Sequence, residues 1–368
     1  MENEQKSGFK EGEIICNQCG AKLTFLPGSN SLNCQFCGAI NEIEVKSAVI
    51  EEIDYLTFIS NKAQEANTIE VHTIKCETCG AQTTFENNII AQTCDFCDSP
   101  LVVGKGQTSK ILEPESLLTF KVTENEGKNK FKTWLRKIWF APNDLKKYAY
   151  QKDKLRGMYL PYWTYDSKTI THYRGERGDD YQEQESYTND KGERATRTVT
   201  KTRWTSTSGT VRDNFDDVLV VASNSLPKKH VYNLEPWDLK ALTPFDQKYL
   251  AGFKAESYGI NVQEGFEIAK DIMQDTIDAS IRSDIGGDHQ RISSKDTSYN
   301  NITFKHILLP IWLSAYRYNN KVYRFMINGR TGEVQGERPY SWIKITLAAL
   351  AGIAVIATIV YLFNKYGG

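Results

Sequence analysis

Eight cysteines form the clearest chemical pattern in this sequence. They fall into two quartets, and in each quartet two C-x-x-C pairs flank 14 residues: Cys16, Cys19, Cys34 and Cys37, then Cys76, Cys79, Cys94 and Cys97. A C-x-x-C turn directs two thiolates at one point, and two such turns complete the tetrahedron of a closed structural zinc site. The spacing therefore predicts two structural Zn2+ ions, one in each quartet.

The two quartets belong to a duplicated unit. The copies lie 60 positions apart and share five further matched pairs: Gly20/Gly80, Ala21/Ala81, Thr24/Thr84, Phe25/Phe85 and Phe36/Phe96. Units of about 30 residues bury too little apolar surface to fold alone, so the metal must supply folding free energy on the order of 10 kcal/mol per site. Iron bound by four thiolates is the alternative. Zinc is favoured because a filled four-ligand site in a duplicated hairpin is typical of structural rather than redox chemistry.

Catalytic patterns are sparse in the rest of the chain. The sequence has no serine elbow, no H-E-x-x-H helix and no G-x-G-x-x-G loop. Residues 102–110 resemble a phosphate loop only superficially, because Ser109 stands where glycine must precede the lysine. Asp288 and His289 are the one place where an acid adjoins a base, in a loop whose composition also suits a turn. The sequence predicts a non-enzymatic protein, and an enzyme centred on these two residues is a third hypothesis. The remaining histidines are His72, which is predicted to be a strand residue, His172, His230 and His306.

The charge of the predicted ribbons indicates whether they contact nucleic acid or protein. Residues 11–45 and 74–104, which hold the two predicted ribbons, each have one lysine against four acidic residues, a net charge of −3 before the thiolates are counted. Nucleic-acid binding depends on lysine and arginine displacing the counterions of phosphate, so these surfaces favour protein partners. The alternative is a membrane-tethered nucleic-acid binder that uses residues 121–156, where 11 Lys or Arg face four acids.

One stretch near the C-terminus has membrane character. Residues 345–363 carry no charge and as a helix would span about 28 Å, close to the hydrocarbon thickness of a bilayer. Trp342 and Tyr361 stand at interfacial positions, and Lys344 and Lys365 bracket the run. A buried core helix is the alternative, and it is disfavoured because only five residues follow the run. We therefore expect a single-pass, tail-anchored protein of the cell membrane.

The expected location of the body is the cytoplasm. The polar segment 1–12 shows no signal-peptide pattern. All eight cysteines fall in metal-site quartets, which indicates a reducing compartment. The formal net charge of −1 gives no overall attraction to nucleic acid or membrane, so any such attraction must come from local patches.

Two helices are predicted between residues 121 and 341. Apolar residues from Phe131 to Trp139 recur at helical spacing, and Pro142 stops that helix. One interpretation is that the basic side of this helix lies against anionic lipid headgroups. The favoured interpretation is a helix that packs in the core and exposes its basic side to water. Asn261 and Glu264 form a capping box before a second helix that ends at residues 286–287.

Strand patterns fill most of the same region. An alternating strand is predicted at 159–173, two apolar strands at 307–318 and 321–328, and a Thr-rich hairpin at 186–208. Two L-P-x-W motifs, at 160–163 and 309–312, predict related sheet segments that pack side by side, with each proline at a strand start, an edge or a bulge. Chance similarity of four residues is the alternative.

These patterns predict an α+β protein. It consists of two small N-terminal zinc ribbons, a mainly antiparallel β domain with a few helices, and one C-terminal transmembrane helix. The expected order is a polar tail (1–12), zinc ribbon 1 (13–45), a linker or helix (46–73), zinc ribbon 2 (74–104), a linker (105–120), the α+β domain (121–341) and the transmembrane helix (343–364).

The order of motifs resembles a bacterial membrane-anchored family with two TFIIB-type zinc ribbons. The motifs are GMYLPYWTYDS (157–167), FDDVLVVAS (215–223), EPWDL (235–239), DIGGDHQRI (284–292), FKHILLPIW (304–312) and YRFMINGRTGEVQGERPYSW (323–342). Members often carry the label of a primosomal helicase, which the lack of an ATP-binding motif contradicts. One departure is Asp98, where the second knuckle of the family usually has glycine.

The resemblance implies a membrane-attached adaptor. Some relatives are linked with envelope-stress systems of the phage-shock type or with flotillin-like membrane proteins. Together with the acidic ribbons, this predicts a protein that binds protein partners at the cytoplasmic face. No small-molecule substrate is expected.

Overall fold

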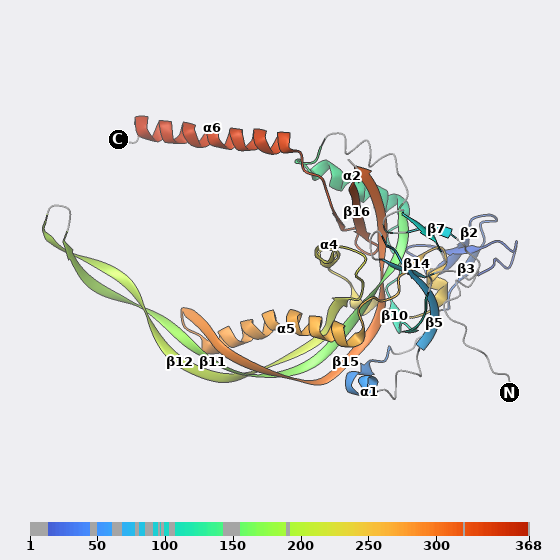
Figure 1. Ribbon diagram of the computed structural model, residues 1–368, viewed down its shortest axis with the longest axis horizontal. Coiled ribbons are helices and arrows are strands. Elements are labelled where there is room, and N and C mark those ends of the chain that lie inside the picture. The colour runs from blue at the N-terminus through green and yellow to red at the C-terminus, as the bar shows by residue number, and fades with distance from the viewer. Residues whose placement is uncertain are drawn as a thin grey trace.

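Three very long antiparallel strands organise the structure. The strands β11 (Arg156–Thr188), β12 (Arg194–Val221) and β15 (His289–Tyr318) lie in one sheet, with β11 between the other two (Figure 1). The sheet continues from β15 through β10 to β13. The computed structural model describes residues 14–44, 50–60, 68–77, 81–84, 91–94, 96, 99–102, 107–142, 155–188, 192–318 and 321–366.

The distal part of β11 and β12 forms a two-stranded arm. β15 pairs with β11 only as far as the Gly178–His289 pair, whereas β12 follows β11 to the Thr188–Arg194 pair. Residues 179–188 and 194–203 therefore project beyond the third strand by about 30 Å (Figure 1). We call these residues the arm, and they confirm the predicted Thr-rich hairpin, whose turn at 189–191 lies outside the described residues.

The helix α5 (Val262–Ile285) lies along one face of the sheet (Figure 1). It begins with the predicted capping box, in which the Asn261 side chain accepts a bond from the Glu264 amide at 2.8 Å. It ends at Gly286, whose φ of +65° is accessible to glycine at little cost. Its buried residues recur at helical spacing and close the core beneath β11, β12 and β15: Phe266, Ala269, Met273, Ile277 and Ile281.

The two L-P-x-W motifs are direct neighbours in the sheet. Leu160 of β11 pairs with Leu309 of β15, which confirms that the two segments pack side by side. Both prolines lie inside long strands, but each stands one residue beyond the end of another neighbour, β12 or β16 (Lys321–Asn328). The Pro161 carbonyl accepts a bond from Ala222 and the Pro310 carbonyl from Gly329, so each proline nitrogen faces that strand end. No ladder bond is lost there, but the expectation of a strand start, an edge or a bulge is wrong, because both prolines lie within long paired strands.

The first cysteine module packs on the large domain. Its strands are β1 (Leu23–Phe25), β2 (Ser31–Cys34) and β3 (Ile40–Glu42). Phe25 contacts the rings of Tyr249 and Phe253 at centroid distances of 5.4 and 6.3 Å, and its amide donates to the Ala251 carbonyl. Cys16 and Cys34 therefore share one hydrophobic cluster with the core of the large domain.

The second cysteine module is built on β5 (Thr68–Lys75), which confirms the strand expected before it. β5 pairs with β6 (Gln82–Thr84) and with β9 (Gln107–Leu112), and β7 (Ala91–Thr93) pairs with β8 (Pro100–Val102). The linker expected at 105–120 is wrong in this respect, because it contains β9 and β10 (Ser116–Leu117). These strands form because β5 and β15 offer open edges that pair with them.

Two shorter helices connect the modules and the sheet. The segment expected as a helix or spacer contains β4 (Ile53–Asp54) and α1 (Tyr55–Ile59). The helix α2 (Glu124–Lys137) begins with a capping box between Thr123 and Glu126 and buries Phe131 and Leu135. The prediction that Trp139 belongs to its core face is wrong: the helix ends at Lys137, and Trp139 is 75% exposed.

The remaining elements complete the α+β fold. The helix α6 (Trp342–Tyr366) leaves the body as a separate rod (Figure 1). The mainly antiparallel β domain with a few helices is confirmed. The other short elements are α4 (Lys228–Tyr232), η2 (Leu239–Ala241), β13 (Thr243–Pro244), η3 (Gln247–Leu250), β14 (Lys254–Ala255) and β17 (Val334–Gly336).

Candidate metal centre

The first cysteine quartet comes together in space as predicted. The four Sγ atoms lie within 4.8 Å of one another. The Cys16–Cys37 and Cys19–Cys34 sulfur distances are 3.6 and 3.5 Å. A tetrahedral zinc site with Zn–S bonds of about 2.3 Å has sulfur–sulfur edges of about 3.8 Å, so the cluster is close to the size of a metal tetrahedron.

Two matching turns position these thiols. The amides of Cys16 and Cys34 donate to the carbonyls of Ala21 and Ala39 at 2.8 and 2.9 Å, and two glycine amides close the turns onto the cysteine carbonyls. Those glycines, Gly20 and Gly38, have φ values of +72° and +75°, where a side chain would be strained. The two C-x-x-C-G segments of the first module therefore have the same turn geometry.

Hydrogen bonds from backbone amides and repulsion between neighbouring sulfurs shift the pKa values of the thiols in opposite directions. The Cys37 amide has the largest effect on the Cys34 thiol and stabilises its thiolate. Burial opposes this effect, but with the help of the Phe36 amide the pKa of Cys34 is lowered to about 6. The Ala39 amide also favours the Cys37 thiolate, but the neighbouring Cys19 and Cys34 sulfurs outweigh it and raise the pKa of Cys37 to about 12. Four thiolates this close need a cation between them. The donor set fits a thiophilic divalent ion.

The second quartet is only partly described. Cys76 and Cys94 are buried, whereas Cys79, Cys97 and Asp98 lie outside the described residues. The Cys76 amide donates to the Ala81 carbonyl at 2.8 Å and the Cys94 amide to the Ser99 carbonyl at 2.7 Å. These two bonds repeat those that Cys16 and Cys34 make with Ala21 and Ala39 in the first module. The six described cysteines form no disulfide.

Asp288 and His289 do not face each other as an acid–base pair. The Asp288 carboxylate accepts a bond from the Asp180 amide at 2.8 Å, and His289 Nε2 lies 3.1 Å from the Asp180 carboxylate. The Thr202 hydroxyl and then His289 lower the pKa of Asp180, which favours its charged form. Both residues thus attach the helix–strand loop to the base of the arm. His72 lies in β5, and its side chain is outside the description.

Sequence reasoning missed a buried cation in the large sheet. The Lys305 side chain is 9% exposed and lies 2.7 Å from the Asp217 carboxylate and 3.0 Å from that of Glu52. Asp217 has a φ of +52° next to a β-bulge after Tyr165, and its amide donates to Asp166. Burial and then Glu52 raise the pKa of Asp166 to about 6. The four residues come from β11, β12, β15 and the segment just before β4, so no local pattern in the sequence marks them.

Lys305→Ala should destabilise the protein by about 3 kcal/mol, because it leaves two partly buried carboxylates without their cation. The measurement is the free energy of unfolding in detergent by chemical denaturation. Lys201→Ala is the matched control, since Lys201 pairs with Glu183 at the surface of the arm and its loss should cost at most about 1 kcal/mol. Equal losses in the two variants would contradict a structural role for the buried pair.

Glu256 is a second buried ionisable group without a signal in the sequence. Its side chain is 5% exposed and accepts a hydrogen bond from the Ser225 hydroxyl, and its other oxygen has no partner among the described residues. Burial raises the pKa of Glu256 to about 8. The folded protein therefore holds a proton that the unfolded chain, with a pKa near 4.5, releases.

The sign of this linkage predicts a pH dependence. Because the unfolded state loses the Glu256 proton first, the free energy of unfolding should fall as pH rises from 4.5 towards 8. Glu256→Gln should make that slope shallower by up to one proton, about 1.4 kcal/mol per pH unit. Unfolding titrations at several pH values measure it. Parallel curves for the two proteins would show that Glu256 does not retain the proton.

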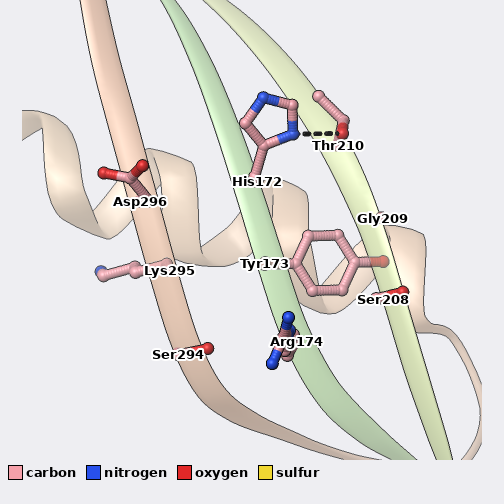
Figure 2. A pocket seen from close by; sticks show the side chains of 9 residues that line it. All are labelled: His172, Tyr173, Arg174, Ser208, Gly209, Thr210, Ser294, Lys295 and Asp296. Carbon is pink, nitrogen blue, oxygen red and sulfur yellow. Dashed lines mark hydrogen bonds between the residues drawn. The ribbon is translucent and has the colours of Figure 1, made fainter.

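A polar recess of about 450 Å3 lies on the three long strands, and Figure 2 shows its lining. Several lining side chains are already engaged within the protein. His172 Nδ1 lies 2.8 Å from the Thr210 hydroxyl, Tyr173 donates to Asp284 at 2.6 Å, and Lys295 pairs with Asp278. The recess therefore offers few polar groups that converge on a ligand. Its lining is His172, Tyr173, Arg174, Ser208, Gly209, Thr210, Ser294, Lys295 and Asp296.

Comparison with known proteins gives one similar chain. The uncharacterized protein YdjG of Bacillus subtilis (strain 168) is 27% identical over 342 residues, which cover 92% of this chain and 93% of that protein. No family model and no solved structure matches. The similarity concerns most of the chain rather than a single module.

Proposed function

We propose that this protein is a non-enzymatic, single-pass membrane adaptor that binds protein partners at the cytoplasmic face. The observation that carries the proposal is α6. Its apolar window has a mean hydropathy of 2.4, and none of that window is buried in the protein. A helix of this composition needs an apolar environment, and its 25 residues span about 37 Å, enough to cross a bilayer.

The cysteine modules support a cytoplasmic body. A thiol cluster of this geometry needs reduced cysteines, which persist in a reducing compartment. In the proposal each quartet holds one structural Zn2+, so two ions support the two modules. The proposed process is envelope stress, as implied by the resemblance to families linked with phage-shock and flotillin-like systems.

The surface of the first module supports protein contacts. Phe36 lies in the turn between Cys34 and Cys37 and is 83% exposed, and Ile15 and Ile40 are 54% and 66% exposed. The residue that matches Phe36 in the second module, Phe96, is buried to 1% exposure in the core. An exposed aromatic ring of this kind is typical of a contact that a partner covers. The acidic surroundings of the cysteines disfavour phosphate.

The test of the anchor is extraction of membranes with alkaline carbonate, followed by protease treatment of spheroplasts. The proposal expects the full chain to stay with the membrane and its body to be cleaved only after the membrane is opened. Release by carbonate, or cleavage by protease added from outside, would overturn the anchor or its orientation. The alternative nucleic-acid binder instead requires salt-sensitive binding that charge reversal at Lys128, Lys130 and Lys132 weakens.

A further inference from the structure

The end of α2 meets the start of α6. The Lys344 ammonium donates to the carbonyls of Trp139 and Ala141 at 3.1 and 2.8 Å. The Ser341 amide donates to the Phe140 carbonyl at 2.7 Å. These bonds join two segments that are about 200 residues apart in the sequence. The turn after α2 therefore lies beside the first turn of the membrane helix.

Aromatic side chains at this junction are exposed. Trp139 and Phe140 are 75% and 38% exposed, and Tyr340 and Trp342 are 56% and 79% exposed. An indole or phenol ring has an apolar body and a polar edge, which suits the boundary between water and hydrocarbon. Three rings of this kind together with the phenyl ring of Phe140 at one place are unusual for a surface that faces only water.

The charges at the same junction are positive. Arg136 and Lys137 occupy the last turn of α2, and both are exposed. The Arg338 guanidinium lies 5.4 Å from the centre of the Tyr340 ring, and Lys344 lies in the first turn of α6. Basic residues beside a membrane helix attract anionic lipid headgroups. The junction thus combines the two kinds of side chain found at a bilayer surface.

We propose that this junction, residues 136–140 together with 338–344, lies in the headgroup layer of the bilayer that α6 crosses and contacts anionic lipid there. The inference rests on the proposed membrane anchor. Lys344 immediately precedes the uncharged run that starts at Ile345, so the Trp139 carbonyl bonded to Lys344 lies at the level where hydrocarbon begins. The exposed Trp139, two residues beyond the end of α2, becomes an interfacial anchor.

The direction of the arm places a further condition on this arrangement. Figure 1 shows α6 and the arm leaving the body towards the same side. The arm carries ion pairs such as Arg197–Glu185 and Lys201–Glu183, so it cannot enter hydrocarbon. In the membrane, α6 must therefore make a different angle with the arm, and the bonds of Lys344 and Ser341 to residues 139–141 keep the junction at the start of α6.

The test uses the full chain in vesicles of phosphatidylcholine and phosphatidylglycerol that contain a lipid with a nitroxide at the headgroup. The readout is quenching of tryptophan fluorescence. In the unmodified protein the proposal places two tryptophans, Trp139 and Trp342, at the interface. Trp139→Phe should therefore reduce the quenched amplitude by roughly half. Trp204→Phe is the matched control: Trp204 lies at the base of the arm under the Arg291 guanidinium, and its loss should leave the quenched amplitude unchanged.

The outcomes separate the junction from the anchor. If Trp342→Phe lowers the quenched amplitude but Trp139→Phe does not, the junction proposal is overturned and the anchor stands. If neither variant lowers it, α6 is not inserted and the proposed function fails as well. Replacing phosphatidylglycerol by phosphatidylcholine should weaken the Trp139 component, and the same result in both lipids would overturn the contact with anionic headgroups.

Discussion

Cys34→Ser is expected to remove one metal ion per chain and to unfold the first cysteine module. Cys34 is 1% exposed, and its sulfur is one of the four that lie within 4.8 Å of one another. A structural zinc ion contributes on the order of 10 kcal/mol to a module of this size. Three strands of three or four residues offer little to replace it.

The loss should spread beyond the module. Phe25 packs between the module and the rings of Tyr249 and Phe253, so unfolding of β1 exposes part of the core of the large domain. We expect both a drop in metal content, measured by elemental mass spectrometry of the purified full chain, and faster proteolysis near residues 245–255. Gln35→Ser is the matched control, because it alters the exposed neighbour of Cys34 and keeps all four thiols. Unchanged metal content in Cys34→Ser would contradict the metal centre.

Placing two charges in the middle of α6 should release the protein from membranes. Ile353 and Ile356 are 63% exposed and lie near the centre of the uncharged run. Each aspartate at the centre of a membrane helix costs about 2.5–3.5 kcal/mol on insertion scales, so Ile353→Asp combined with Ile356→Asp should disfavour insertion by about 5–7 kcal/mol.

The measurement is the distribution of the full chain between membrane and soluble fractions after alkaline carbonate. The control combines Ile353→Leu with Ile356→Leu, which keeps the hydropathy and should remain in the membrane. Membrane association of the aspartate variant equal to that of the leucine control would mean that α6 does not hold the protein in the bilayer.

Local signals predicted the elements that depend on local physics. The capping box at Asn261, the spacing of Phe266 and Met273, and the uncharged run of α6 each specify a helix through residues close in the chain. The L-P-x-W repeat predicted the pairing of two segments about 150 residues apart, because the shared pattern indicates related sheet segments. The first cysteine quartet was predictable since metal geometry leaves few alternatives.

Tertiary contacts decided what local patterns could not. The residues of β9 were expected to belong to a linker at 105–120, and they form a strand because β5 presents an open edge. Trp139 fits the helical period of α2, but the helix ends two residues earlier and the side chain turns outwards. The partners of Lys305 are Glu52 and Asp217, and no local window of the sequence contains all three residues.

The duplicated modules show most clearly how context changes equivalent residues. Phe36 and Phe96 occupy matching positions, yet Phe96 is buried in the core and Phe36 faces solvent. The first module is also fixed to the large domain by Phe25. The part of the first module that remains available for a partner is therefore the turn around the cysteines.

The most direct test of the adaptor is cross-linking of the full chain in intact cells, followed by purification in detergent and identification of what is attached. Wild type and Gln35→Ser should yield the same partner protein, and Phe36→Ser should reduce its recovery by about tenfold, as expected for an aromatic residue at the centre of a contact. Metal content should be unchanged in Phe36→Ser. Equal recovery from all three proteins, or recovery of nucleic acid in place of protein, would contradict the account.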